Sequence, residues 1–311
     1  MIKSHFNNLN GWIIIDKQAG VTSRQIVNKI SKIFRLNKIG HGGTLDPMAT
    51  GVLPIALGEA TKLISFIQNK KKKYLFTIKW GEATDTEDIE GKVIEKSDIR
   101  PNKEQINKAL NAFIGQINQK PPVFSAIKIN GQRSYNLARK NISISHKARQ
   151  INVHELSLKK IINLDSAEFE VICGKGTYVR SLARDIAEKL NTRGHITNLR
   201  RQFVGNFHEK DTIFIDFFEE MIHSPSFLKK IKPIEKVLDD IPALFLTETE
   251  AMKLRQGQKI TLDSFKFNND FIREYPNYKK FERVYTLSDD KLVALIEIDK
   301  GIVKPKRIIN Y

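Results

Sequence analysis

One loop of the sequence combines glycine, proline and a carboxylate in a pattern suited to chemistry. The segment IGHGGTLDPMATG runs from Ile39 to Gly51 and places Asp46 between a leucine and a proline, close to His41. Glycine and proline enforce backbone shapes that helices and strands cannot supply. Such a loop can hold a carboxylate at a fixed angle, as a nucleophile or general base requires. Asp-Pro is also common in ordinary turns, and the pattern alone favours that structural interpretation.

Other side chains suited to chemistry stand at the ends of expected elements. Lys17 closes the apolar run WIIIDK, Tyr74 follows a run of lysines, and Arg180 ends the segment CGKGTYVR. Each has an ordinary structural interpretation, because a tyrosine at a strand start can pack on the core and an arginine can face solvent on a helix. The lysine in CGKGT lacks the spacing of a phosphate-binding P-loop. The residues alone therefore leave the choice between structure and catalysis open.

Taken together, these segments resemble the motifs of the TruB family of tRNA pseudouridine synthases. The loop around Asp46 is similar to that family's catalytic signature, and the match continues to Lys62. The other matching segments, in order, are Asp16–Ser23, Lys73-Tyr74, Pro122–Lys128, Cys173–Arg180 and Leu199–Arg201. The family usually has a proline where this chain has Gln18, so the loop that presents Lys17 is expected to be looser.

The resemblance implies a reaction that needs neither a cofactor nor a metal. Enzymes of this family break the N1–C1′ glycosidic bond of uridine 55 in the T-loop of tRNA. They rotate the detached uracil and rejoin it through C5. The chain has one cysteine and no cluster of histidines and cysteines, so the sequence offers no set of metal ligands of that kind.

The resemblance also assigns the catalytic residues. Asp46 matches the catalytic aspartate, which either adds covalently or removes a sugar proton. Arg180 matches the arginine that pairs with it, and a nearby positive charge would keep the carboxylate ionised and aimed. Tyr74 matches the tyrosine that stacks on the target base, with a phenol that can assist proton removal.

Four further positions match residues that contact the substrate. Tyr178 corresponds to a second aromatic contact, and Leu199 to an apolar wall of the pocket, although core packing alone would explain a leucine there. Lys17 either supports its loop or contacts RNA. His41 corresponds to the histidine that fills the gap left by the flipped base, where it can offset part of the cost of unstacking.

The charge balance favours a polyanionic partner. Lysine and arginine outnumber aspartate and glutamate by 52 to 35, which gives a net charge of +17. Such an excess is typical of proteins that bind RNA or DNA, and less often of proteins that bind an anionic membrane surface. The lysine-rich composition of an AT-rich genome is the alternative explanation.

Composition also restricts the compartment and the use of the cysteine. No apolar run is long enough to span a bilayer, and the N-terminal residues do not resemble a signal peptide. We therefore expect a cytoplasmic protein without a membrane partner. Cys173 lies in an alternating apolar segment and is expected to be a small buried residue rather than a reactive thiol.

Hydrophobic periodicity predicts an α+β protein of two domains. Residues 1–238 should form the catalytic domain that the resemblance implies, with a mixed, largely antiparallel sheet, and residues 239–311 a small β-rich domain. The segments Leu254–Gln258 and KLVALIEIDKGIVKPKRII in this second part resemble a PUA-like RNA-binding domain. Expected strands are Trp12–Asp16, Val52–Leu57, Tyr74–Trp80, Phe124–Ile129, Gln150–Lys159 and Ala167–Cys173. Expected helices are Ser23–Phe34 with Ser23 as its cap, Glu59–Ile67, Glu104–Phe113, Ser134–Lys140, Tyr178–Leu190 and most of Phe214–Val237.

Three functional hypotheses fit these observations. The first is a monomeric enzyme that acts on the T-arm of tRNA without a guide RNA. The second is a binding module that remodels tRNA without chemistry, and the third is a subunit of a guide-RNA-dependent complex. The presence of Asp46, Tyr74 and Arg180 favours an enzyme. Neither a helix-turn-helix pattern nor a basic amphipathic helix supports a DNA regulator or a membrane-surface protein.

Overall fold

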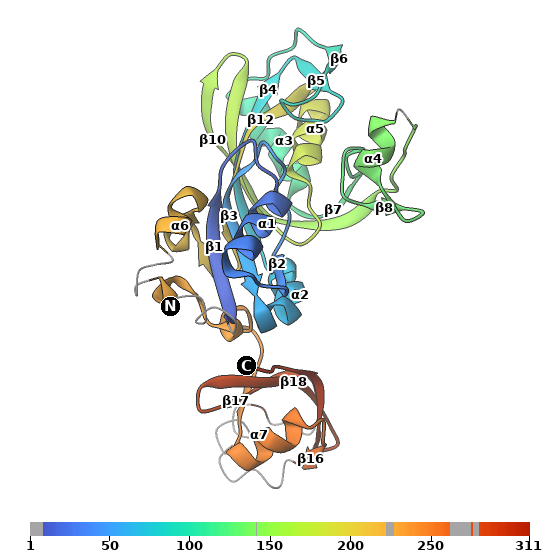
Figure 1. Cartoon of the computed structure of the whole chain (residues 1–311). Coiled ribbons are helices and arrows are strands. Elements are labelled where there is room, and N and C mark those ends of the chain that lie inside the picture. Colours follow the sequence, from blue (N-terminus) through green and yellow to red (C-terminus); the bar gives the residue numbers. More distant parts are fainter. Residues whose placement is uncertain (1–8, 141, 222–226, 262–274, 276–279) are drawn as a thin grey trace.

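The computed structural model of the chain describes residues 9–140, 142–221, 227–261, 275 and 280–311. Within these residues two sheets form separate bodies, a large domain built on a ten-stranded sheet and a C-terminal domain built on a five-stranded sheet (Figure 1). The fold is α+β, as predicted. No helix in the described part of the chain is both long and apolar enough to cross a membrane.

The large sheet is mixed and mostly antiparallel. Its main path is β14-β1-β3-β12-β4-β11-β10-β7, with β2 on β3 and β13 on β12. Only the pairs β1/β14 and β3/β12 are parallel among these neighbours. The bounds are β1 Gly11–Lys17, β2 Ile39–His41, β3 Thr50–Leu57, β4 Lys72–Trp80, β7 Gly115–Gln119, β10 Arg149–Asn163, β11 Ser166–Cys173, β12 Gly194–Val204, β13 Phe207–His208 and β14 Ile213–Phe214.

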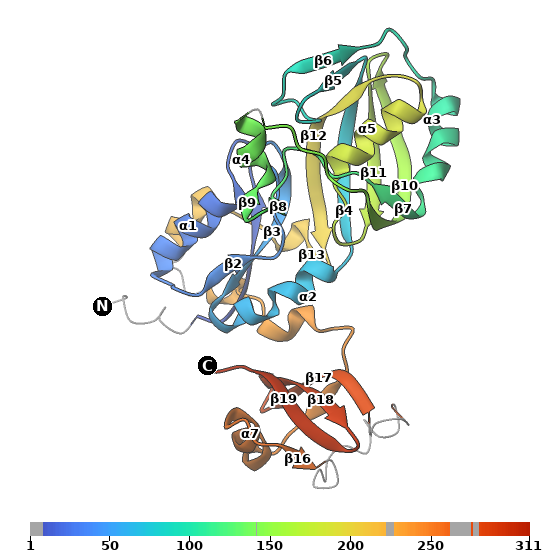
Figure 2. The same ribbon diagram turned by 90° about the vertical axis from the view of Figure 1, so that its right-hand side faces the viewer.

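Three amphipathic helices cover one face of this sheet. They are α1 Ser23–Phe34, α3 Lys103–Leu110 and α5 Val179–Lys189. Figure 2 shows α1 and α5 lying across the strands. Apolar side chains such as Ile30 and Ile186 point into a single core with alternate strand residues such as Ile13 and Phe169. All seven residues of β1 are buried, because a second apolar cluster covers the opposite face.

Two short hairpins extend from the sheet. β5 Glu82–Thr84 pairs with β6 Val93–Lys96. β8 Lys128–Ile129 pairs with β9 Gln132–Arg133 through the Asn130-Gly131 turn, and both turn residues have positive φ. The second hairpin and α4 Ser134–Arg139 lie in the segment between β7 and β10. The expected strand Phe124–Ile129 was wrong over its first four residues, which pair with no strand.

Three features differ from the expectations. Thr22, rather than Ser23, caps α1, because its side chain accepts a hydrogen bond from the Gln25 N–H. Phe214–Val237 is mostly helical where it is described, as expected, but it consists of the short α6 Phe218–Met221 and three 3₁₀ turns rather than one continuous helix, and residues 222–226 lie outside the described part. A proline at position 233 cannot donate the backbone bond that a continuous helix needs. The long strand β12 was not predicted.

The C-terminal domain is β-rich, as predicted, and contains one helix that was not predicted. The strand order is β15-β17-β18-β19-β16, with α7 Glu248–Arg255 packed on the sheet. The strand bounds are β15 Ala243–Phe245, β16 Ile260–Thr261, β17 Lys280–Ser288, β18 Lys291–Asp299 and β19 Ile302–Ile308. A Thr247–Glu250 capping box begins α7 and is the sequence signal that could have revealed it.

A buried carboxylate joins the two domains. Glu59 is 4% exposed and accepts hydrogen bonds from Lys62 Nζ (2.5 Å), Lys38 Nζ (2.9 Å) and the Asn310 N–H (3.0 Å). Lys62 Nζ also donates to the Ile308 carbonyl at 2.7 Å. Burial opposes the charge of Glu59, but the hydrogen bonds outweigh it and lower its pKa to about 2. The C-terminal domain is therefore held to the large domain by polar contacts as well as by a shared apolar cluster.

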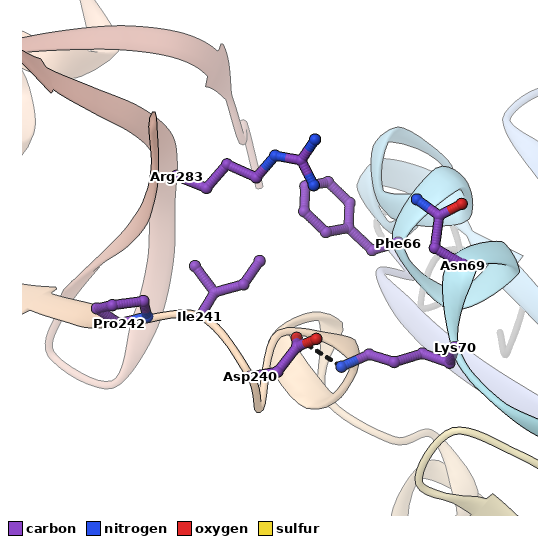
Figure 3. Close-up of a pocket in the computed structure, with 7 residues that line it drawn as sticks. All are labelled: Phe66, Asn69, Lys70, Asp240, Ile241, Pro242 and Arg283. Atoms are coloured by element: carbon purple, nitrogen blue, oxygen red, sulfur yellow. Dashed lines mark ion pairs between the residues drawn. The ribbon is translucent and has the colours of Figure 1, made fainter. Parts of the chain in front are cut away.

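A cavity of about 250 Å³ opens beside this junction, between α2 Ile64–Asn69 and the C-terminal sheet (Figure 3). Phe66 and Arg283 approach each other across it. On one side Lys70 Nζ forms ion pairs with Asp239 (2.6 Å) and Asp240 (2.5 Å). The positive charge of Lys70 is thus compensated by two carboxylates beside the cavity.

We predict that Glu59→Gln destabilises the protein by about 1–3 kcal/mol at neutral pH, because buried donors lose a charged acceptor. The folded pKa lies below the ordinary value of 4.5, so this stabilisation is present above pH 4.5 and is lost as the pH falls toward 2. Thermal unfolding of wild type and variant at pH 7 and pH 3 measures the difference. Glu188→Gln, an exposed change on α5, is the control. An equal effect of Glu59→Gln at both pH values would contradict the prediction.

Candidate active site

The loop that carries Asp46 is fixed from both sides. It connects β2 to β3. Arg201, which is 1% exposed, donates to the carbonyls of Val52 (2.7 Å) and Gly43 (3.0 Å). Ser23 Oγ accepts from the Leu45 N–H at 2.9 Å and lies 3.1 Å from the carbonyl of the same residue. The backbone next to Asp46 is therefore held by side chains from α1 and β12.

A close approach of two strands requires glycine at one end of this loop. Gly51 has φ +98°, and a Cβ there would lie 2.2 Å from the carbonyl oxygen of Arg201. Any side chain at this position would strain the backbone and push β12 away from β3. The glycine thus lets the strand that carries Arg201 reach the loop that carries Asp46.

Lys17 acts as a structural support of the same loop. Its side chain is fully buried, and Nζ donates to the carbonyls of Val21 (2.6 Å), Gln18 (2.9 Å) and Pro47 (2.9 Å). Burial lowers the pKa of Lys17 to about 8, although the charge of Asp46 opposes this shift. Of the two roles considered, the structure shows the support of the loop. The Lys17 ammonium joins the loop around Gln18 to Pro47, the residue after Asp46. The loop is therefore held in place although Gln18 stands where the family usually has a proline.

Arg180 grips the Asp46 carboxylate with two nitrogens. Arg180 Nε lies 2.9 Å from Oδ2 and Nη2 lies 3.2 Å from Oδ1, a bidentate arrangement that fixes the plane of the carboxylate. The arginine side chain is 5% exposed, whereas that of the aspartate is 32% exposed. The pair thus presents an aimed carboxylate to solvent from a buried cation.

Three further groups hold the Arg180 guanidinium. Nη1 donates to the Thr86 carbonyl at 2.8 Å, Nη2 donates to the Phe124 carbonyl at 3.0 Å, and the Asp88 carboxylate lies 3.4 Å away. Burial disfavours the charge of Arg180, but Asp46, Asp88 and Glu87 outweigh it and raise its pKa. The guanidinium therefore stays charged although it is almost wholly buried.

Sequence reasoning missed the contribution of the acidic segment after β5. Glu87 accepts from Ser181 Oγ at 2.8 Å and pairs with Arg184 on α5. The Ile196 N–H donates to the Glu87 carbonyl at 3.1 Å and anchors the segment to β12. Glu90 follows, and burial together with the charges of Asp88 and Asp46 raises its pKa. The clustering of acidic residues in TDTEDIEG was the available signal.

Tyr74 and Leu199 lie on neighbouring strands of the sheet. Tyr74 on β4 is 8% exposed, and Leu199 on β12 is 4% exposed. Burial raises the pKa of the Tyr74 phenol, and Arg201, its partner in the strand register, opposes this shift. The tyrosine is therefore a neutral phenol at physiological pH. The negative charge of Asp46 also raises the pKa of this phenol.

His41 and Tyr178 stand at the ends of two different elements. His41 ends β2, and its buried Nδ1 has no hydrogen-bond partner among the described residues. Burial and then the charge of Arg201 lower its pKa, which keeps the ring neutral. Tyr178 is half-buried at the N-terminal end of α5, two residues before Arg180.

The described residues contain no group of three or more histidine, cysteine, aspartate or glutamate side chains that could hold a metal ion. Cys173 is 1% exposed, and burial raises the pKa of its thiol to about 11. This confirms the prediction that the cysteine is a buried residue rather than a reactive thiol.

Two family models match consecutive parts of the chain. Residues 31–179 match the model described as TruB family pseudouridylate synthase (N terminal domain), and residues 180–239 match the tRNA pseudouridylate synthase B C-terminal domain. The chain belongs to the TruB family and is an enzyme of the pseudouridine synthase class.

Curated relatives cover nearly the whole chain. The tRNA pseudouridine synthase B of Rhodospirillum rubrum is 43% identical over 302 residues, which is 97% of each protein. The protein of the same name from Zymomonas mobilis is 46% identical over 257 residues, covering 81% of this chain and 84% of that protein.

Solved structures support the same fold. An H/ACA RNP bound to a substrate RNA contains a chain with a TM-score of 0.71 at 24% identity, covering 97% of this chain and 85% of that one. A chain in a Cbf5-Nop10-Gar1 complex gives 0.72 at 25% identity, covering 99% and 87%.

We predict that Lys17→Met lowers the turnover rate about tenfold or more, because three loop carbonyls lose their shared donor and Asp46 is less well placed. RNA affinity should change little, since the ammonium is buried. Single-turnover rates and equilibrium binding measure the two effects, with Lys32→Met on the exposed face of α1 as the control. A loss of affinity as large as the loss of rate would show instead that Lys17 contacts RNA.

Proposed function

We propose that this enzyme isomerises uridine 55 in the T-loop of tRNA to pseudouridine, with Asp46 as the catalytic aspartate. The observation that carries the proposal is the Asp46 carboxylate, gripped at both oxygens by a buried arginine yet 32% exposed. The motif resemblance and the relatives named tRNA pseudouridine synthase B support the choice of substrate.

The reaction requires the carboxylate to be ionised and correctly oriented. Asp46 either adds covalently to the substrate or removes a proton from the sugar, and both routes need a deprotonated oxygen near the detaching uracil. Arg180 supplies a positive charge and two donors that fix the plane of the carboxylate. Its own carbonyl and carboxylate partners fix it, so the carboxylate does not have to reorganise when the base arrives.

The other predicted residues would form the pocket for the base. Tyr74 would stack on the uracil as a neutral phenol, because burial raises its pKa; proton removal would require its pKa to fall when substrate binds. Leu199 would form an apolar wall, and Tyr178 would contact the substrate beside Arg180. A neutral His41 would fill the gap left by the flipped nucleotide, since an uncharged ring can stack where a base has left.

The domains would divide the work of binding RNA. Residues 1–238 would form the catalytic domain and hold the T-arm. Residues 239–311 would form the PUA-like domain and bind phosphates of the acceptor arm. Most of the positive charge lies in the first part of the chain. We propose that the enzyme acts in the cytoplasm as a monomer, without a guide RNA, a metal or a cofactor.

The direct test is tritium release from unmodified tRNA transcript labelled with 5-³H-uridine, with no metal and no guide RNA added. We predict release by wild type and a loss of at least about 10³-fold in Asp46→Asn, a magnitude typical of removing an essential catalytic group. RNA affinity and the fold should be retained, because the amide keeps the size of the side chain. The melting temperature should fall, since the buried Arg180 loses one of its counter-charges.

A transcript in which uridine 55 is replaced by cytidine is the matched substrate control and should release no tritium. Release from that transcript would place the reaction at another uridine. Release by Asp46→Asn would overturn the catalytic assignment. An inactive wild type that still binds tRNA would favour the binding-only or guide-dependent hypothesis.

A further inference from the structure

A buried glutamine holds the backbone of Tyr178 with both ends of its amide. Gln119, the last residue of β7, is fully buried. Its Oε1 accepts from the Tyr178 N–H at 2.9 Å, and its Nε2 donates to the Tyr178 carbonyl at 3.0 Å. Two opposed hydrogen bonds to one peptide residue fix its position and its orientation together. The Gln119 side chain thus makes the two hydrogen bonds that the backbone of a neighbouring strand residue would otherwise make to Tyr178.

The partner of Gln119 on the neighbouring strand holds the same residue by its ring. Arg149 begins β10 and stands opposite Gln119 in the strand register. Its guanidinium carbon lies 4.8 Å from the centre of the Tyr178 ring, within the range of a cation–π contact. Arg149 Nη2 also donates to the Gly176 carbonyl at 2.6 Å. The edge pair β7/β10 therefore holds the turn before α5 at three places.

This turn fixes the first residues of the helix that carries Arg180. Tyr178 occupies the N-cap position of α5 but makes no capping hydrogen bond with its own side chain. Its carbonyl accepts from the Leu182 N–H at 3.0 Å, the first bond of the helix. Gln119 binds the same carbonyl from outside. A shift of this residue would therefore move the start of α5 and the guanidinium two residues further on.

We propose that Gln119, supported by Arg149, is a positioning residue for the reaction: it sets Tyr178 and, through the first turn of α5, aims Arg180 at the Asp46 carboxylate. The inference rests on the proposed function of this site. Gln119 would contact neither the substrate nor the Asp46 carboxylate. Its effect is on the angle at which the ion pair presents the carboxylate to the base.

The test compares Gln119→Met with Gln116→Met. Methionine has nearly the length of glutamine but makes neither hydrogen bond, and Gln116 is an exposed residue of the same strand. When the folded enzyme is in saturating excess over labelled tRNA, the single-turnover rate does not depend on the folded fraction of the enzyme. We expect Gln119→Met to lower this rate about 10- to 100-fold, the range for a displacement of up to about 1 Å. The affinity for tRNA and the rate of Gln116→Met should be unchanged.

A double-mutant cycle with Arg180→Lys tests the route of the effect. If Gln119 acts through Arg180, the methionine change should have little further effect once the bidentate grip is lost. Additive losses would overturn the positioning role, as would an unchanged rate in Gln119→Met beside an active wild type.

The same experiment separates the two proposals. An inactive wild type would overturn the proposed function itself. If Gln119→Met does not fold, Arg149→Met and Arg149→Lys test the contact with the Tyr178 ring. Both variants leave the buried side chain of Gln119 unchanged. A slower rate in the methionine variant with partial recovery in the lysine variant is the expected result, and equal rates in both and in wild type would overturn the claim.

Discussion

The ion pair between Asp46 and Arg180 determines how the rest of the large domain is arranged. A guanidinium that is 5% exposed must be compensated on every side, since an unpaired charge in the protein interior is very unfavourable. Asp46 supplies one counter-charge, Asp88 supplies a second, and carbonyl oxygens take the remaining donors. Of the two carboxylates, Asp46 is the one open to solvent, because its side chain is 32% exposed and that of Asp88 is 4% exposed.

These groups come from parts of the chain that are distant in sequence. Asp46 lies after β2, Thr86 follows β5, Phe124 belongs to the segment between β7 and β10, and Arg180 is in α5. The sheet brings them together because β12 lies between β3 and β4. Three buried cationic or amide side chains, Lys17, Arg201 and Gln119, then hold the loops by their backbone carbonyls. Side-chain contacts to backbone, rather than regular secondary structure, fix the site.

Periodicity and motif resemblance were sufficient for most elements and for the ion pair between Asp46 and Arg180. Strands such as Tyr74–Trp80 and helices such as α1 and α5 have clear apolar patterns. The apolar residues of Phe214–Val237 indicated helix but did not reveal the breaks between its short turns. The ligands of Arg180 could not be predicted, because the carbonyls of Thr86 and Phe124 carry no side-chain signal. The role of Gln119 depends on tertiary contacts across 59 residues.

We propose that the fixed direction of the Asp46 carboxylate, and not its charge alone, makes the site reactive. The most direct measurement is the single-turnover rate of Asp46→Glu on tRNA transcript, beside its affinity for the same RNA. Glutamate keeps the charge but moves it by one methylene away from the bidentate grip. We expect the rate of Asp46→Glu to be at least about 10²-fold below the rate of wild type, with the affinity for tRNA retained. A rate within a few fold of wild type would contradict it.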